Sequence, residues 1–342
     1  MRLPLVPDIS SRDGSSTKNA RMYNVLKETK PTGQELAVVR PGLTEFASTT
    51  GAGKGLVCWN GTLVAMYGAT SYIVAEEAQF EASLETMPTD AEWASIARNG
   101  TVFCAVARSS SIAATSPDGI TWTQRTLPAS VDWQDIAWNG TVFCAIATGP
   151  SSIAATSPDG ITWTQRTLPA SASWEAIAWN DTVFCALAIN SSIAATSPDG
   201  ITWTQRALPA SEAWAAVAWN GTVFCALVEE STIAATSPDG ITWTERALPA
   251  DNTWNNIAWN GTVFCAIGYS SSIAATSPDG ITWTQRALPS ALNWGGIASN
   301  GSFFIIPAIE EPTACKAVLN DEFTPVSGTV SGSFFDFAQS PT

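Results

Sequence analysis

The sequence predicts an all-β protein, a β-propeller of seven (alternatively eight) four-stranded antiparallel blades with an N-terminal arm, and three observations favour this fold. A cassette of about 40 residues recurs almost unchanged, which is typical of solenoids and propellers. Its Ser-Pro-Asp-Gly segment begins at Ser116, Ser157, Ser197, Ser237 and Ser277. An Asn-Gly pair, or once Asn-Asp, follows Trp59, Arg98, Trp138, Trp179, Trp219, Trp259 and Ser299. Finally, no segment has the 3.6-residue period of an amphipathic helix.

Each repeat predicts four short strands joined by tight turns. In one repeat we expect them at 133–138, 141–147, 152–156 and 161–166. Asn139-Gly140 predicts a type I′ turn, in which both central residues have positive φ. The Ser157-Pro-Asp-Gly160 segment predicts a second tight turn, with Gly where left-handed backbone is needed. The second strand is apolar on both faces, as expected of a strand between neighbouring sheets.

The repeats divide the chain into three segments. Residues 1–43 are expected to form an arm whose strands, near 22–27 and 35–40, help to close the ring. Residues 44–332 form the propeller of seven repeats, and 333–342 supply a closing strand and tail. The first and seventh repeats lack the Ser-Pro-Asp-Gly segment, as terminal repeats often depart from the consensus. If the arm and tail share a further sheet, the ring has eight blades.

Charge is divided unequally between the arm and the body. Residues 1–43 carry seven Lys and Arg against four acids, whereas the rest of the chain carries nine against 26. A body this acidic repels nucleic acid, so DNA is expected to pass it without sequence-specific binding. No apolar run is long enough for a signal peptide or a membrane span, so we expect synthesis in the cytoplasm and no membrane insertion.

The cysteines and the absence of histidine argue against metal or disulfide chemistry. Cysteine occupies the same position in five successive repeats, too far from its equivalents for a disulfide, at Cys104, Cys144, Cys185, Cys225 and Cys265. We expect these to be small apolar core residues. The chain has no histidine, and one acid per repeated turn does not converge on a point. We therefore expect no metal and no cofactor.

Residues of the repeated turn are expected to be structural. The Asp and Ser side chains accept hydrogen bonds from backbone N–H groups of their own turn, and the following Trp packs between blades. They are Ser116, Asp118, Gly119, Trp122, Asp159, Trp163, Asp199, Trp203, Asp239, Trp243, Asp279 and Trp283. The run Ser-Pro-Asp-Gly-Ile-Thr-Trp resembles the Asp-box of sialidase-type propellers, shortened by one residue between Asp and Gly. That resemblance implies a fold element between the third and fourth strands of a blade.

Both repeated turns are expected on one face of the disc, with the second loop and the link between blades on the other. The turns hardly change between copies, whereas the opposite face varies. We expect any partner to bind that variable face, although drift at exposed sites explains the variation equally well. The candidate residues are Arg108, Asp132, Gln134, Asp135, Glu175, Glu212, Glu229, Glu230, Asn252, Asn255, Asn256, Tyr269 and Asn293.

A sialidase-like fold does not by itself imply an enzyme. In that family, catalysis uses three convergent arginines, a tyrosine nucleophile with a glutamate, and an acid. Here the repeated arginines fall one per blade, at Arg125, Arg166, Arg206, Arg246 and Arg286. No repeat concentrates acids in the manner of a glycosidase pair. We therefore expect no catalytic residues.

The N-terminal region carries a second resemblance. In their order, residues 19–24, 36–43 and 60–68 resemble the opening of tail nozzle proteins of short-tailed bacteriophages, also called packaged-DNA stabilisation proteins. This implies a non-enzymatic virion protein, made in the host cytoplasm, that forms a homo-oligomeric ring, usually of six. Its neighbours would be an adaptor and fibres, and it would retain packaged DNA and pass it at ejection. The alternative is a tail fibre or adhesion propeller that binds a host-surface glycan or receptor through its variable face.

Overall fold

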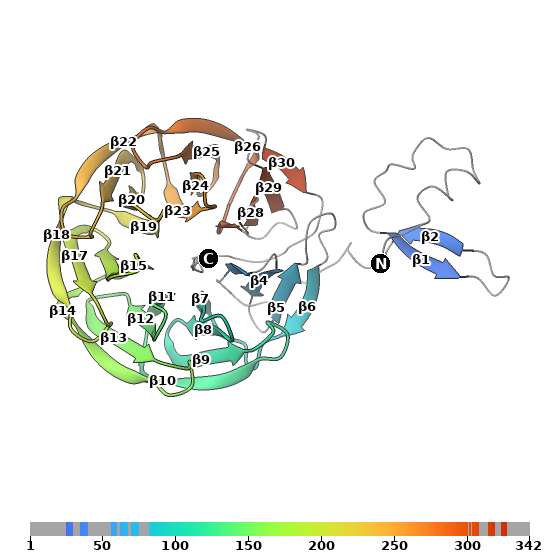
Figure 1. The fold of residues 1–342 in the computed structure, drawn as a ribbon, viewed down its shortest axis with the longest axis horizontal. Coiled ribbons are helices and arrows are strands. Elements are labelled where there is room, and N and C mark those ends of the chain that lie inside the picture. Colours follow the sequence, from blue (N-terminus) through green and yellow to red (C-terminus); the bar gives the residue numbers. More distant parts are fainter. Residues whose placement is uncertain are drawn as a thin grey trace.

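The computed structural model describes residues 82–299 without a break, residue 301, five strands before this stretch (β1 to β5) and three after it (β28 to β30). Side-chain burial is described for residues 87–299, 301 and 303–306. The described strands form one two-stranded and seven four-stranded sheets, and every pairing is antiparallel. The four-stranded sheets surround a central axis as the blades of a β-propeller (Figure 1). The predicted fold class is confirmed.

Each blade has its four strands in chain order, with the first strand nearest the axis. Blade 1 contains β3 (Leu56–Trp59), β4 (Thr62–Tyr67), β5 (Thr70–Val74) and β6 (Ala82–Thr86). Blade 2 contains β7 (Trp93–Arg98), β8 (Phe103–Ala107), β9 (Ser110–Ser116) and β10 (Thr123–Val131). Blade 3 contains β11 (Trp133–Trp138), β12 (Phe143–Ala147), β13 (Ser151–Ser157) and β14 (Thr164–Ala172). Blade 4 contains β15 (Trp174–Trp179), β16 (Phe184–Ala188), β17 (Ser191–Ser197) and β18 (Thr204–Glu212).

The remaining blades repeat this order. Blade 5 contains β19 (Trp214–Trp219), β20 (Phe224–Val228), β21 (Ser231–Ser237) and β22 (Thr244–Asn252). Blade 6 contains β23 (Trp254–Trp259), β24 (Phe264–Gly268), β25 (Ser271–Ser277) and β26 (Thr284–Leu292). Blade 7 contains β27 (Ala298–Ser299), β28 (Phe303–Pro307), β29 (Ala314–Val318) and β30 (Phe323–Val326). Outside the blades, β1 (Val25–Thr29) pairs with β2 (Glu35–Val39).

The ring closes with seven blades. Innermost strands contact one another in the order β3, β7, β11, β15, β19, β23 and β27, and β27 in turn contacts β3. The two arm strands pair with each other and, among the described strands, with no blade. The predicted closing strand of the tail lies outside the described residues, as does most of the arm. The segment boundaries 1–43, 44–332 and 333–342 therefore stay predictions.

The turn between the first and second strands differs from the predicted type I′ turn. Gly140 has a φ of 89°, but neither Asn139 nor Thr141 has positive φ. Asn139 N donates to Val142 O at 3.2 Å, which makes Gly140 and Thr141 the central pair. Positive φ at only the first central residue is the pattern of a type II′ turn. Asn139 Oδ1 accepts hydrogen bonds from Thr141 N and Val142 N at 2.8 and 2.7 Å, so the Asn side chain closes the turn.

The fourth strand of a blade begins and ends later than predicted. In blade 3 the Asp159 Oδ1 atom accepts hydrogen bonds from the N–H groups of Ile161 and Thr162, which holds those residues in the turn. The strand then continues past Leu168 to Ala172. Leu168, which lies beyond the predicted end of this strand, is 2% exposed and belongs to the core between blades 3 and 4.

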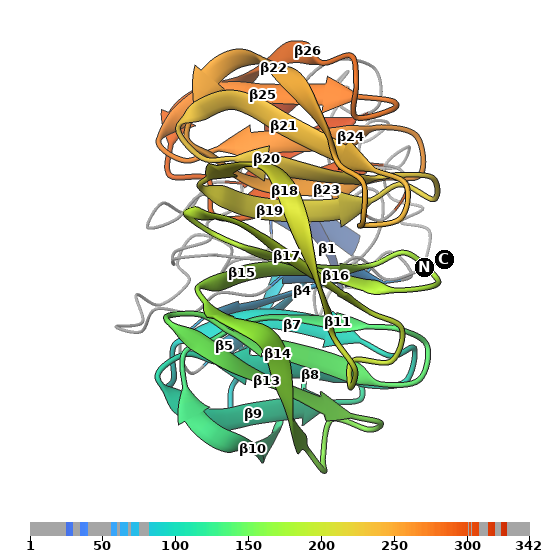
Figure 2. The ribbon, with the colours of Figure 1, turned by 90° about the vertical axis from the view of Figure 1, so that its left-hand side faces the viewer.

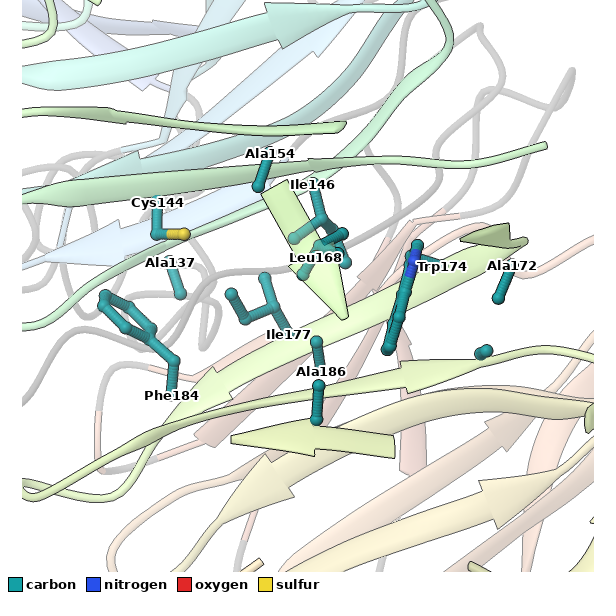
Figure 3. Close-up of a cluster of buried hydrophobic side chains, with 12 residues drawn as sticks. Ala137, Cys144, Ile146, Ala154, Leu168, Ala172, Trp174, Ile177, Phe184 and Ala186 are labelled. Atoms are coloured by element: carbon teal, nitrogen blue, oxygen red, sulfur yellow. The ribbon is translucent and has the colours of Figure 1, made fainter. Parts of the chain in front are cut away.

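The hydrophobic core lies between successive blades (Figure 3). Between blades 3 and 4, Trp174, Ile177 and Phe184 of blade 4 pack with Ile146 and Leu168 of blade 3. The Trp that begins or precedes each innermost strand of blades 2 to 7 is fully buried, at Trp93, Trp133, Trp174, Trp214, Trp254 and Trp294. Removing a side chain of this size from a core typically costs ~3–5 kcal/mol. The repeated Trp thus anchors each blade to the blade before it.

The Ser-Pro-Asp-Gly turns of blades 3 to 6 also pack against the preceding blade. A Cβ atom at Gly200 would lie 2.9 Å from Thr156 Cγ2 and 3.3 Å from Cys144 Sγ, both of blade 3. Three other turns make the same approach with Gly160, Gly240 and Gly280. The cysteines are buried free thiols, and burial raises the pKa of Cys144, which keeps it protonated. Their repeated position is explained by the small side chain that this contact needs.

The two glycine-containing turns allow a matched test of this contact. Gly200 (φ +73°) meets the neighbouring blade, whereas Gly221 (φ +92°) has no atom within 4 Å of a Cβ built there. Gly221→Ala is expected to cost about 1–2 kcal/mol from left-handed strain alone. Gly200→Ala is expected to cost a further 1–3 kcal/mol, roughly, from overpacking. Denaturant unfolding of both variants measures the difference, and equal losses would contradict the proposed contact.

Candidate functional site

The two faces of the disc are built from different loops. The strands run between them (Figure 2), so the Asn-Gly and Ser-Pro-Asp-Gly turns share one face, here called the turn face. The opposite face, here called the link face, holds the loop between the second and third strands and the link between blades. Thr148 N of such a loop donates to Asp132 O of a link at 2.8 Å, and four other blades repeat this bond. Loop and link therefore lie together.

Polar side chains of the turn face form hydrogen bonds within their own turns. In blade 4, Ser197 Oγ accepts a hydrogen bond from Gly200 N at 2.8 Å, and Asp199 Oδ1 accepts from Thr202 N at 3.0 Å. Burial acts to raise the pKa of Asp199, but hydrogen bonds from the backbone of Thr202 and Ile201 and from the Ser197 hydroxyl outweigh it and lower the pKa. Trp203 Nε1 donates to Gly200 O at 3.1 Å.

The same bonds recur in the other copies. They involve Ser116, Asp118, Gly119 and Trp122 in blade 2, and Asp159, Trp163, Asp239, Trp243, Asp279 and Trp283 in blades 3, 5 and 6. The structure thus places all the predicted turn residues in hydrogen-bonded turns of their own blades.

The predicted interaction residues fall into two groups on the link face. Partly buried or exposed positions are Arg108, Asp132, Glu175, Glu212, Glu229, Glu230, Asn252, Asn255, Tyr269 and Asn293. Gln134, Asp135 and Asn256 are instead buried, with exposed fractions of 3%, 2% and 3%. The prediction that they are accessible to a partner is wrong. These three lie on innermost strands, where the neighbouring blades cover them. Partner binding by the accessible group stays a prediction.

Some link-face residues hold neighbouring blades together. Ser109 of blade 2 donates to Asp132 Oδ1 of the following link through its N–H at 2.9 Å and its hydroxyl at 2.6 Å. Ser270 Oγ donates in the same way to Asn293 Oδ1. Asn252 packs against Gly268, where any side chain would clash with it. Some of the residues that differ between repeats on this face are therefore hydrogen-bonded or packed against each other in pairs.

The loops of the link face also share one unusual backbone conformation. Ser109, Asn190, Glu230 and Ser270 have φ between 48° and 53°, and Gly149 holds the corresponding place in blade 3 with a φ of 77°. Residues other than Gly, Asn and Asp rarely adopt this conformation. The loop shape is thus the same whether its residue is Ser, Asn or Glu.

Asp135 joins three blades through one buried carboxyl group. Its Oδ1 accepts hydrogen bonds from Ser95 Oγ of blade 2 at 2.9 Å and from Ile136 N at 2.6 Å. Its Oδ2 accepts from Ile177 N of blade 4 at 2.7 Å. Burial raises the pKa of Asp135 to about 7, helped by the charge of Glu175 and opposed by the three hydrogen bonds. The carboxyl therefore titrates near neutral pH.

Ser95 was not predicted as a site residue, although one signal in the sequence points to it. Aligned repeats place Ser95, Asp135, Ala176, Ala216 and Asn256 at one position. Ser95 offers a hydroxyl donor, and Asp135, one repeat later, is the only acid among these five residues. The two therefore form a donor and an acceptor on neighbouring innermost strands. Among the described residues, no group of three or more His, Cys, Asp or Glu side chains is placed to hold a metal ion. The described part of the chain contains no helix able to span a membrane.

Solved structures similar to this chain are propellers of diverse kinds. Selenomethionine-substituted virginiamycin B lyase from Staphylococcus aureus aligns with a TM-score of 0.67 at 10% identity, over 76% of this chain and 92% of that one. YCF48 bound to D1 peptide aligns with a TM-score of 0.56 at 15% identity, over 70% and 83%. The computationally designed Ika8 protein aligns with a TM-score of 0.62 at 10% identity, over 84% and 91%.

These likenesses show the fold alone. In all, 1029 chains of solved structures match, so the shared feature is a common architecture and no single activity. No protein-family model matches the sequence, and no curated protein matches it. The fold is that of a β-propeller similar to virginiamycin B lyase.

The Asp135 carboxyl group predicts an unusual pH dependence of stability. Its pKa is about 7 in the folded chain, against roughly 3.9 in an unfolded chain. A group whose pKa is higher in the folded state stabilises the fold when it is protonated. This stabilisation is complete at a pH below the pKa of the unfolded chain, and it is lost as the pH rises through the pKa of the folded chain. The free energy of unfolding is therefore expected to fall between about pH 4 and pH 7.

Denaturant midpoints at pH 5 and pH 8 measure this effect. Asp135→Asn should reduce the difference between the two midpoints, because no proton is bound or released at that site. Asp132→Asn, on the same face, is the control and should keep it. An unchanged difference in Asp135→Asn would show that other groups cause the pH dependence.

Proposed function

We propose that this chain is a non-enzymatic protein of a bacteriophage tail, in which the propeller serves as an interaction body. The first candidate function is that of a nozzle subunit, which forms the distal DNA conduit, retains packaged DNA and passes it at ejection. The observation that carries the proposal is the contrast between the two faces. Turn-face residues recur unchanged and bond within their own blades, whereas sequence differences gather on the link face. This is the expected pattern of a rigid scaffold that presents contacts on one side.

The chemistry of the blades supports a role without catalysis. Arg206 Nε donates to Thr196 Oγ1 at 2.9 Å, and the arginines of the four other copies make the same bond within their own blades. They therefore serve the blade and do not converge on a substrate carboxylate. Virginiamycin B lyase is described as catalytically inactive when one of its histidines is replaced by alanine. This chain contains no histidine.

The tail assignment rests on the arm and on the distribution of charge. Residues 19–24, 36–43 and 60–68, in their order, resemble the opening of nozzle proteins, whose subunits form rings, usually of six, below an adaptor and beside fibres. The acidic body would let genomic DNA slide past without sequence-specific binding. The basic arm would dock on an acidic neighbour, which favours assembly in the virion.

Imaging of virions tests the nozzle assignment. Particles carrying a tagged copy of this chain should show the tag on the tail axis, in a ring of identical subunits. Particles that lack the chain should lose packaged DNA, because the conduit is open. Label on peripheral fibres, or its absence from virions, would contradict the assignment.

The second candidate function is adhesion to a host-surface glycan or receptor. It is favoured by the variable link face and by the resemblance of the repeated turns to the Asp-box of sialidase-type propellers. YCF48, a similar propeller, is described in complex with a peptide. Such surfaces bind through exposed polar and aromatic side chains.

A glycan array with the full chain tests the adhesion function. Glu230→Ala and Tyr269→Ala on the link face should reduce binding about tenfold or more if these side chains are contacts. Thr222→Ala on the turn face is the matched control and should bind like wild type. Binding lost equally in all three variants, or absent from wild type, would rule out adhesion through the link face.

A further inference from the structure

The Asn side chain in the turn between the first and second strands is held in the same way in successive blades. Asn139 Oδ1 accepts hydrogen bonds from Thr141 N and Val142 N at 2.8 and 2.7 Å. Asn220 Oδ1 accepts the equivalent bonds at 2.8 and 2.7 Å, and Asn260 Oδ1 accepts them at 2.9 and 2.8 Å. Two N–H groups are therefore already placed at each oxygen to stabilise a negative charge that develops there.

The Gly that follows the Asn presents an unhindered backbone nitrogen. Gly140 and Gly221 have φ of 89° and 92°, and a Cβ atom at either position would meet nothing within 4 Å. Gly140 N donates no hydrogen bond to any residue in the described part of the chain. It adjoins Asn139 in the sequence, so its bond to the side-chain carbon Cγ would close a small ring. In blade 4 Asp181 takes the place of the Gly, and its side chain hinders such an attack.

The reaction that these groups can perform is deamidation within the chain. Gly140 N gives its proton to hydroxide and attacks Asn139 Cγ, while the charge that develops on Oδ1 is stabilised by the two N–H donors. The bond from Cγ to Nδ2 then breaks, and Nδ2 takes a proton from water and leaves as ammonia. The succinimide that remains is opened by one water molecule. The product is Asp or isoaspartate, according to which carbonyl group the water attacks.

The turns differ in the burial of the amide group that has to leave. Asn99, Asn139 and Asn220 are only partly buried. Asn260 is 4% exposed, and its Nδ2 atom is buried and has no hydrogen-bond partner. Water reaches that atom, and ammonia departs from it, only if the turn opens first. Local opening costs free energy, so the buried turn is expected to react more slowly than the others.

We propose that Asn99, Asn139 and Asn220 are deamidation sites on the turn face, and that burial protects Asn260. Each event replaces a neutral amide with a carboxylate, which adds negative charge to that face. An Asp product keeps the acceptor of the turn and strengthens its hydrogen bonds. An isoaspartate product lengthens the main chain and disturbs the hairpin. The modification is independent of the tail assignment, because it depends on these turns alone.

Mass spectrometry of the full chain tests the proposal after incubation at pH 8 and digestion with trypsin. Trypsin cuts after the Arg of each fourth strand, so Asn139, Asn220 and Asn260 fall in separate peptides, and fragmentation identifies the modified residue. In the folded chain Asn139 and Asn220 should each react about tenfold faster than Asn260, or more, because Asn260 reacts only from an opened turn. The rates should rise with pH, since the attacking nitrogen must lose its proton.

Peptides that are incubated after digestion provide the matched control. Residues 136–146 and 257–267 have the same sequence, so Asn139 and Asn260 should react at equal rates once the fold is removed. Asn139→Gln should abolish the mass change in its peptide, which contains no other Asn, and should leave the rate at Asn220 unchanged.

Two results would overturn the proposal. One is a folded chain in which Asn139 and Asn220 react no faster than Asn260. The other is a folded chain that shows no deamidation at Asn139 or Asn220 by the time the digested peptides have reacted completely.

Discussion

The architecture depends on one close contact, which the Ser-Pro-Asp-Gly turns of blades 3 to 6 make with the blade that precedes each of them. Gly200 is needed there twice, for its positive φ and because Thr156 and Cys144 leave no room for a Cβ atom. The Ser and Asp side chains fold the turn into the shape that makes this approach possible. Since the partner always lies one repeat earlier, every residue of the contact must recur at the same spacing. This explains why the cassette is nearly identical in five copies.

Contacts on the link face are of another kind, because they differ from blade to blade. Asp132 and Asn293 each accept a bond from the Ser of the preceding loop, whereas Asp135 takes its partners from three blades. Part of the variation therefore consists of matched pairs that join particular neighbours. The ring has the same fold all round, but the blades can be told apart by their link-face side chains.

Much of the fold could be predicted from the sequence, because the repeat shows directly how many strands a blade has and in what order. The type of the Asn-Gly turn could not, because the Asn139 side chain accepts the hydrogen bond from Thr141 N that a type I′ turn would direct to Trp138 O. The burial of Gln134 and Asp135 could not be predicted either. The register of β11 shifts between Trp133 and Asp135, and such a bulge changes which way a side chain points without changing the apolar pattern of the sequence. Ser95 and Asp135 meet only when neighbouring blades are assembled, which the sequence of a single blade does not show.

The loops of the link face hold Ser109, Glu230 and Ser270 in left-handed backbone. Such a conformation costs an L-residue about 1–2 kcal/mol, so each loop spends stability to keep its shape. The backbone bond from loop to link recurs in five blades whatever residue stands at the tip, and we infer that this bond sets the path of the loop. A new residue at the tip changes the chemistry that the face displays while the display frame stays fixed. Single substitutions at a tip can thus change the chemistry of the face while the backbone of the loop stays the same, although at Ser109 and Ser270 they also remove a bond to Asp132 or Asn293.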